Sequence, residues 1–375
     1  MTVSYSLDAA TASATTVFRL LFRWKGSVWK LIYKEFITWI ILCFLYNVLY
    51  NFVIQDSELE KEYLGWVKTV DKMPIDSTLI FLLSFSTSTS LTRWQDTYKL
   101  LYWPENTAIR FNAYFNDKSV SPRTAKMIRQ TTVRYILLSY VFIFRDVSTC
   151  IRTVMFPTFE KIVESGLLTK SELQLIRSTR LEENACHYWV PLLWIMQIIR
   201  TRYLAQKKRA ATSEEPVPLI MTEVQFGEFV TELVKLRGKI GDLLSYDWVP
   251  IPLALTQTIT VFVYSKLIIS ILQVQSHVMD MNGQWLWIGY AHQLTSNMMT
   301  NLLFISWLRI SQVVVNPFGD DDDDFEIPYL LERHCDILNQ ILCNHSEAEV
   351  RLGKPREERK GKKEVLPHTI ASAFI

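Results

Sequence analysis

Four segments of this chain have the length of a membrane-spanning helix, and they constrain the fold more than any other feature. They occupy residues 36–54, 74–94, 250–273 and 285–315. A helix of roughly 20 residues, at a rise of ~1.5 Å per residue, crosses the hydrocarbon core of a bilayer. The sequence therefore predicts an all-α, polytopic membrane protein with four transmembrane helices.

The composition indicates that a water-exposed part accompanies these helices. Aromatic residues make up 13% of the chain, and Trp and Tyr gather where helices meet the membrane surface. The mean hydropathy of +0.10 is too low for a protein that lies wholly in lipid. The net charge of +2 gives no indication of nucleic-acid binding, so we expect membrane lipids and no nucleic acid as partners.

The stretches between the apolar segments define the remaining predicted regions. These are a cytosolic N-terminal segment with an interfacial helix (1–35), transmembrane helices 1 and 2 (36–94), a cytosolic helical domain (95–249), transmembrane helices 3 and 4 (250–315), an acidic motif with a following helix (316–345) and a disordered charged tail (346–375). Basic residues precede the first span and follow the second. The positive-inside rule then places both termini in the cytoplasm, and we expect a multi-pass protein of the cell membrane.

The second span is the least like a lipid-facing helix. It reads PIDSTLIFLLSFSTSTSLTRW and is rich in hydroxyl side chains. Ser77, Phe81 and Phe85 recur every four residues and therefore share one face of a helix. One interpretation is a helix enclosed by a bundle, which we favour from this segment alone. The other is a helix that lines a pore, with aromatic constrictions and hydroxyl groups.

Lys266 is the one fully charged residue within the third span. It can attract an anion toward a permeation path, or its ammonium group can extend to the nearer membrane interface. The second behaviour is the more common one for lysine, and we favour it.

The stretch NPFGDDDDDFE, residues 316–326, follows the fourth span directly. Pro317 and Gly319 end the helix, and five consecutive aspartates come next. Carboxylates and free backbone carbonyls are the hard oxygen ligands that Ca²⁺ prefers, although the spacing is not that of an EF-hand. Because an acidic run is more often a solvated surface, composition alone favours that interpretation.

Nothing in the sequence indicates catalysis. The adjacent Cys186 and His187 are the only nucleophile-like pair, and neighbouring side chains on a helix diverge. There is no Ser/His/Asp set, HExxH motif or glycine-rich phosphate loop. The cysteines lack the spacing of metal ligands and are interpreted as free thiols. The sequence therefore predicts that the chain is not an enzyme.

The acidic stretch after a fourth span resembles the signature of the bestrophins, a family of calcium-activated anion channels. Other pieces occur in family order: FRLLFRWKGSVWKLIYKEF (18–36), TRW followed by YWPE (92–94 and 102–105), RDVST (145–149) and YDWVPIP (246–252). The resemblance extends from about residue 1 to about residue 343, and the acidic motif is highly specific.

The resemblance implies a homopentamer with one central pore, which conducts chloride and is lined by the second helix. The positions that match the hydrophobic pore neck are Ser77, Phe81 and Phe85, and Val224 matches a cytosolic aperture. The family usually has an apolar residue where this chain has Ser77, so the outer ring of the neck is expected to be wetter. Ser84 likewise replaces a usual glycine. Hetero-oligomers with related subunits are a second possible assembly.

The resemblance also implies a regulatory calcium ion. Its ligands match the side chains of Asp321 and Asp324 and the backbone carbonyls of Ala10, Val313 and Asn316. Calcium would fix the N-terminal segment against the end of the fourth span and favour an open pore. The alternative is a calcium-binding membrane scaffold, or regulator of other channels, that conducts nothing.

Overall fold

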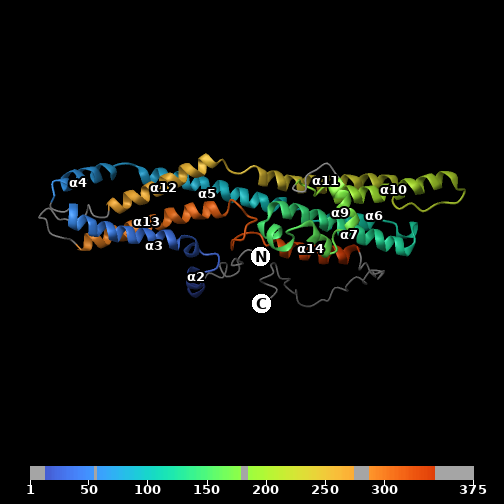
Figure 1. Cartoon of the computed structure of the whole chain (residues 1–375), viewed down its shortest axis with the longest axis horizontal. Helices are drawn as coiled ribbons and strands as arrows, with labels where there is room; N and C mark the ends of the chain where they lie inside the picture. Colours follow the sequence, from blue (N-terminus) through green and yellow to red (C-terminus); the bar gives the residue numbers. More distant parts are fainter. Residues whose placement is uncertain (1–12, 55–56, 179–184, 274–286, 343–375) are drawn as a thin grey trace, which may run out of the picture.

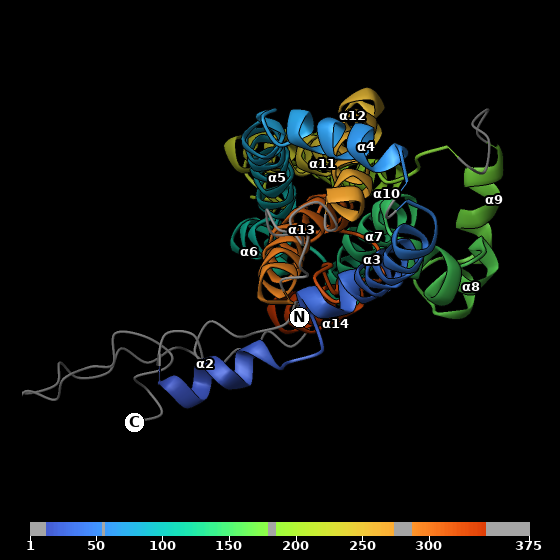
Figure 2. The ribbon, with the colours of Figure 1, turned by 90° about the vertical axis from the view of Figure 1, so that its left-hand side faces the viewer.

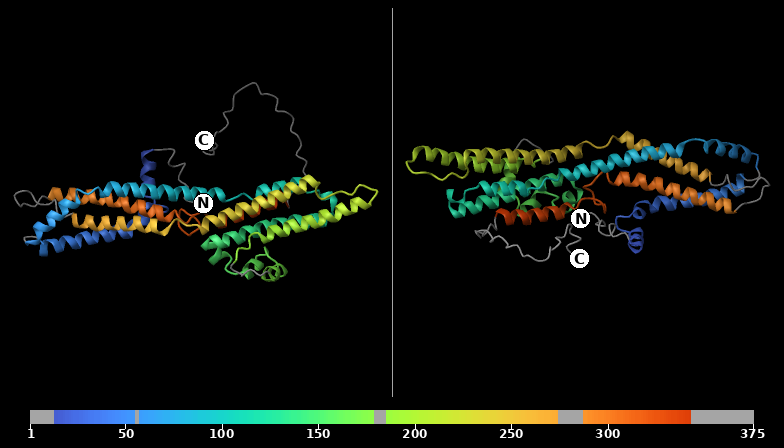
Figure 3. Two further views of the ribbon diagram at one scale, coloured as in Figure 1. Left: turned by 90° about the horizontal axis from the view of Figure 1, so that it is seen from above. Right: turned by 180° about the vertical axis from the view of Figure 1, so that it is seen from behind.

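The computed structural model describes residues 13–54, 57–178, 185–273 and 287–342. Within these ranges the chain forms helices and contains no β-strand, in agreement with the all-α prediction. Figure 1 shows an elongated molecule, and Figure 3 shows the same shape from above and from behind. We call the left-hand part in Figure 1, which holds the long apolar helices, the first end. The right-hand part, which is more polar, is the second end.

Four long helices form the first end. They are α3 (Val28–Leu49), which continues into a π-helical turn (Tyr50–Ile54), α5 (Ile75–Leu100), α12 (Leu253–Gln273) and α13 (Trp287–Val313). Helix α13 packs against α3, α5 and α12, and α12 also contacts α3 and α5. Figure 2 shows these helices end-on as neighbouring columns.

Two apolar clusters hold the four helices together. One joins α5, α12 and α13 and consists of Leu79, Leu83, Ile259, Val263, Phe304 and Leu308. The other joins α3, α12 and α13 and consists of Ile32, Trp39, Cys43, Leu267 and Ile305. Polar side chains also join three of these helices, since the Oγ atom of Ser270 accepts hydrogen bonds from Trp39 Nε1 at 3.1 Å and Asn301 Nδ2 at 2.7 Å.

Two of the described helices are long and apolar enough to cross a membrane by length and composition: Val28–Ile54 and α12. Helices α5 and α13 have 26 and 27 residues, which is long enough. They are not among the two because polar side chains interrupt their apolar sequence, most clearly the serines and threonines of α5.

The interfacial helix expected within residues 1–35 is divided between two helices. Helix α2 (Ala14–Leu21) ends before a turn in which Gly26 has a φ of +69°, a conformation that glycine adopts without strain. Helix α3 then begins, because Ser27 caps it by accepting a hydrogen bond from the Lys30 amide at 3.2 Å. Phe18 and Phe22 are 63% and 83% exposed, as expected for side chains at a membrane surface.

The second end is a bundle around α7 (Pro122–Val147), the helix with the most buried residues. Helix α7 contacts α10 (Val190–Thr212), α11 (Glu223–Trp248) and α14 (Ile327–Leu342). Its apolar run at residues 135–144 is fully covered by protein. Residues of α10 such as Ile195 are also buried in this bundle.

Shorter helices complete the structure. They are α4 (Leu59–Val70) at the first end, and α6 (Glu105–Tyr114), α8 (Phe159–Glu164) and α9 (Lys170–Ser178) at the second. Short helical turns occupy Asp117–Ser119 and Ile151–Met155. Helices α8 and α9 project to one side in Figure 2. The described cysteines Cys43, Cys150, Cys186 and Cys335 are free thiols, as expected.

Candidate functional site

One face of α5 is uncovered, and it carries the residues predicted for the pore neck. Phe81 is 71% exposed and Phe85 is 56% exposed, although both are large apolar side chains. Ser77 lies on the same face and is also exposed. The interpretation favoured from this segment alone, a helix enclosed by a bundle, is therefore wrong for the single chain. The reason is that α12 and α13 cover only the opposite side of α5, where Leu79 and Leu83 are buried.

Hydroxyl groups on α5 bond to the backbone of their own helix. Ser77 Oγ donates to the Pro74 carbonyl at 3.0 Å, and Thr89 Oγ1 donates to the Phe85 carbonyl at 2.9 Å. Such bonds satisfy the hydroxyl proton within an apolar setting. In this arrangement the Ser77 oxygen lies on the uncovered face while its proton points to the helix.

Val224, the predicted aperture residue, lies in the first turn of α11 and is 71% exposed. A capping box fixes this turn, because Thr222 Oγ1 accepts from the Gln225 amide at 3.3 Å and Gln225 Oε1 accepts from the Thr222 amide at 3.0 Å. About 36 Å of helix separates Val224 from Trp248, where α11 ends before α12. The structure therefore does not bring the aperture residue together with the neck residues within one chain.

The acidic segment, residues 316–326, folds into a tight turn after α13. The Asp321 amide donates to Asp324 Oδ2 at 2.7 Å, and the Asp324 amide donates to the Asp321 carbonyl at 3.2 Å. Asp324 is consequently buried, whereas Asp321 is exposed. A Cβ atom at Gly319 would lie 2.7 Å from Asp324 Oδ2, so a larger residue here would force the Asp324 carboxylate to shift.

Negative charge is crowded in this turn. Burial, together with repulsion from Asp321, Asp323 and Asp320, raises the pKa of Asp324 to about 6. Burial and the charges of Asp322 and Asp321 also raise the pKa of Asp323. Both shifts mean that the ionised carboxylates are unfavourable in the absence of a counter-ion.

Some oxygen atoms around this turn are of the kind that a calcium ion binds. Because residue 317 is proline, it has no amide hydrogen to donate to the Val313 carbonyl four residues earlier. Asn316 is exposed beside it, while Ala10 lies outside the described residues. Among the described residues, no group of three His, Cys, Asp or Glu side chains is arranged to hold a metal. Backbone carbonyls would therefore have to complete the ligand set begun by Asp321 and Asp324.

Asp322 has a different role, which sequence reasoning missed. Its Oδ2 atom lies 2.6 Å from Lys30 Nζ and accepts a hydrogen bond from the Gly26 amide at 2.9 Å. The bond from Lys30, with that from Gly26, lowers the pKa of Asp322. The pair joins the acidic segment to the beginning of α3. Because 292 residues separate the partners, no local pattern could have revealed the contact.

Phe325 joins the acidic segment to α5. Its ring centre lies 5.1 Å from that of Trp94, 5.3 Å from that of Tyr98 and 5.8 Å from that of Phe318. The Phe325 amide donates to the Pro317 carbonyl at 2.8 Å, which closes the turn. The acidic segment therefore contacts both α3 and α5.

The sequence favoured a Lys266 side chain that extends to the membrane interface, and the structure shows a different arrangement. The Nζ atom lies 2.7 Å from Asp76 Oδ1, and the Lys266 side chain is 9% exposed. Asp76 lies in the first turn of α5. The side chain does not need to extend to water, because a carboxylate on a neighbouring helix pairs with the ammonium group inside the protein.

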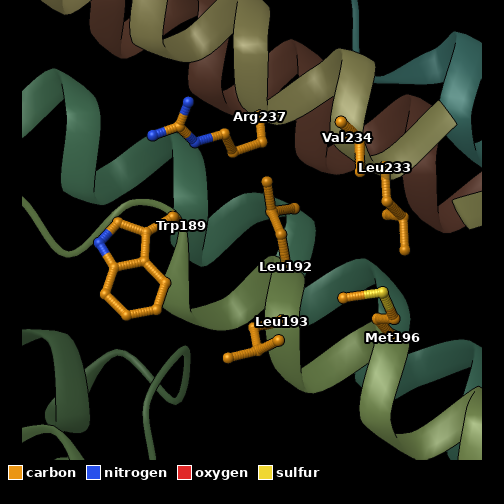
Figure 4. Close-up of a pocket in the computed structure, with 7 residues that line it drawn as sticks. All are labelled: Trp189, Leu192, Leu193, Met196, Leu233, Val234 and Arg237. Atoms are coloured by element: carbon orange, nitrogen blue, oxygen red, sulfur yellow. The ribbon is translucent and has the colours of Figure 1, made fainter. Parts of the chain in front are cut away.

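An apolar cavity of about 330 Å³ lies between α10 and α11. Figure 4 shows its lining: Trp189, Leu192, Leu193, Met196, Leu233, Val234 and Arg237. Of the described residues predicted for the pore or the calcium site, none lines it.

Comparison with known proteins identifies the family. A family model described as "Bestrophin, RFP-TM, chloride channel" matches residues 1–344. Bestrophin-6 of Caenorhabditis elegans is 31% identical over 334 residues, which cover 88% of this chain and 81% of that protein. Bestrophin-1 of Homo sapiens is 29% identical over 343 residues, which cover 90% of this chain and 54% of that protein. Bestrophin homolog 22 of Caenorhabditis elegans is 29% identical over 337 residues, which cover 89% of this chain and 63% of that protein.

The fold agrees with this assignment. The crystal structure of a bacterial bestrophin homolog from Klebsiella pneumoniae matches with a TM-score of 0.56 at 15% identity, covering 84% of this chain and 98% of that one. The chain spans about half to two thirds of the length of several of its relatives, 54% for the human protein and 63% for homolog 22. The family model covers residues 1–344 and names the same family that the acidic motif resembles. This chain therefore belongs to the bestrophin family of membrane proteins.

Proposed function

We propose that this chain is a subunit of a chloride channel whose pore runs along the uncovered face of α5. The observation that carries the proposal is the exposure of Phe81 and Phe85, 71% and 56%, on a helix whose other side is buried. Large aromatic side chains on an uncovered helix face are expected to meet lipid, another subunit or a pore. The flanking hydroxyls of Ser77, Ser84 and Ser88 favour a pore over lipid.

The proposed assembly has four transmembrane helices in each subunit, namely α3, α5, α12 and α13, and five copies around a central axis. Helix α3 is suited to the lipid side, because Ile37, Ile41, Phe44 and Leu45 are all more than half exposed. Helix α5 then faces the axis. The protein lies in the cell membrane, with both termini on the cytoplasmic side. Related subunits are possible partners in hetero-oligomers.

The neck chemistry follows from this arrangement. In a ring of subunits, each of Ser77, Phe81 and Phe85 becomes a ring of identical side chains. Phenylalanine rings can close a pore to water, and their electropositive edges tolerate an anion better than a cation. Ser77 makes the outer ring wetter than the two inner rings. Val224 forms a second constriction at the cytosolic end.

The acidic segment is proposed to make the channel respond to calcium. When bound, the ion would supply positive charge to a turn whose carboxylates repel one another. Asp321 and Asp324 would hold it, with the carbonyls of Val313, Asn316 and Ala10. The high pKa of Asp324, about 6, supports this role, because neutralisation by a cation would relieve the same repulsion.

Current through planar bilayers that contain the purified protein tests both parts of the proposal. With a chloride gradient and stepped calcium, we expect chloride-selective current that rises with calcium. Asp321→Ala/Asp324→Ala should lose the calcium response, whereas Asp320→Ala, an exposed carboxylate outside the proposed ligand set, should keep it. A wild-type chloride current that does not change with calcium concentration would refute the regulatory role of calcium and leave the channel function intact.

A well-formed pentamer that binds calcium and carries no current would refute the channel. That result would instead favour a non-conducting scaffold or regulator of other channels.

A further inference from the structure

The ion pair between Lys266 and Asp76 is a charged contact inside the apolar end of the molecule. Lys266 lies on α12, in an otherwise uncharged helix, one turn before the buried Ser270. The Nζ–Oδ1 distance is 2.7 Å, and the side chains are 9% and 51% exposed, respectively. The lysine is therefore enclosed, whereas its partner retains access to the surroundings of α5.

Stability alone does not explain such a pair. Taking two charges out of water costs about as much as their attraction returns, and apolar side chains of similar volume often stabilise a protein equally well. The neighbouring contacts of α5 with α12 are of that apolar kind, through Leu79, Leu83 and Val263. Ionisable residues within membrane spans commonly mark the path of an ion.

The position of Asp76 connects the pair with the proposed neck. Asp76 directly precedes Ser77 and lies within the first turn of α5. The Asp76 side chain is 51% exposed and contacts Lys266 Nζ with one of its carboxylate oxygens. In an assembly around α5, one such carboxylate per subunit would surround the outer mouth of the pore and repel anions.

We propose that Lys266 sets the anion preference of the pore by neutralising Asp76 at its outer mouth. The inference rests on the proposed channel function. Lys266 is buried on α12, whereas the proposed pore face belongs to α5. The lysine would influence anion specificity there through the Asp76 carboxylate, which it contacts directly. The pair acts on the ion by charge, and no residue of the neck has to move.

A hydrogen bond close to the ion pair provides a matched control. Gln273 Nε2 donates to Asp71 Oδ1 at 2.5 Å and likewise joins α12 to the residues before α5. Gln273→Leu removes this neutral donor without changing the charge of α12. If the ion pair only fastens α12 to the start of α5, Gln273→Leu and Lys266→Met should have similar effects.

The experiment measures the chloride-to-sodium permeability ratio from reversal potentials in planar bilayers under a sodium chloride gradient. The proteins are the wild type, Lys266→Met, Asp76→Asn, Lys266→Met/Asp76→Asn and Gln273→Leu, each checked for assembly by size-exclusion chromatography. We expect Lys266→Met to lower the ratio by roughly threefold or more. The double variant should restore it, Asp76→Asn should raise it, and Gln273→Leu should leave it unchanged.

Two results would overturn the inference while leaving the channel intact. One is an unchanged ratio in an assembled Lys266→Met protein, and the other is an equal fall in Lys266→Met and the double variant, which indicates a structural role. If Lys266→Met does not assemble, an unchanged ratio in Asp76→Asn overturns the inference instead. Absence of anion current in the wild type would refute the proposed function itself, and the inference with it.

Discussion

Replacement of Phe325 by leucine should weaken the calcium response of the current without closing the pore. Phe325 directly follows Asp324, and its amide closes the acidic turn on the Pro317 carbonyl at 2.8 Å. Its ring contacts Trp94 and Tyr98 of α5. This side chain therefore gives the acidic turn a direct contact with α5, through which a change on calcium binding can reach that helix.

The magnitude can be worked out from the ring contacts. Phe325 has three aromatic neighbours, with ring centres 5.1, 5.3 and 5.8 Å away. Each such pair contributes about 0.5–1.5 kcal/mol beyond simple burial, so the leucine variant loses roughly 1.5–4.5 kcal/mol in total. If about 2 kcal/mol of this is present only in the calcium-bound arrangement, the calcium concentration for half-maximal current rises about 30-fold.

The assay is macroscopic current in planar bilayers over a calcium titration, with maximal current recorded at saturating calcium. Phe159→Leu is the matched control. Phe159 is also buried, and its ring lies 5.8 Å from Phe142 and 5.9 Å from His187 in the bundle around α7. It should lose comparable stability and keep the wild-type calcium dependence.

The reasoning fails if Phe325→Leu lowers the thermal unfolding midpoint as Phe159→Leu does but leaves the calcium titration unchanged. The aromatic contacts would then hold the fold together equally in both states, and the turn would have to act on α5 by another route.

Three further predictions concern single residues. Burial alone would raise the pKa of Glu172, but hydrogen bonds from Arg134, Tyr135 and Thr169 outweigh it and lower the pKa to about 2. The ionised side chain therefore contributes roughly 3 kcal/mol above pH 4.5, which is lost as the pH falls through about 2. Glu172→Gln should thus unfold earlier than the wild type in thermal scans at neutral pH, and the gap should narrow below pH 4.5; a gap independent of pH would contradict this origin. Gly319→Ala should weaken calcium binding in calorimetry by about tenfold, because its Cβ atom would lie 2.7 Å from Asp324 Oδ2; Gly227→Ala, whose Cβ would meet nothing within 4 Å, should bind normally. Ser77→Leu should dry the outer neck ring and lower single-channel conductance several-fold, and an unchanged conductance would place Ser77 outside the narrow part of the pore.

The sequence predicted the helices well because their signals are local. Apolar length, helix caps and proline positions lie within a few residues of the element that they determine, as with Ser27 before α3 and Thr222 before α11.

The errors came from contacts between distant segments. Which side of α5 is covered depends on where α12 and α13 lie, so composition could not show that Phe81 is exposed while Leu83 is buried. Lys266 was expected to extend outward because its partner, Asp76, lies on another helix. The neck, aperture and calcium residues came from family resemblance, and their roles remain predictions.

The contacts of Asp322 and Phe325 make the acidic turn a junction between two helices. Lys30 and Gly26 hold it to the start of α3, and Trp94 and Tyr98 hold it to α5. In the proposed channel, a displacement of this turn would be transmitted to both helices at once. Opening within one subunit should then occur in a single concerted step, without intermediate conductance levels in which α3 has moved and α5 has not.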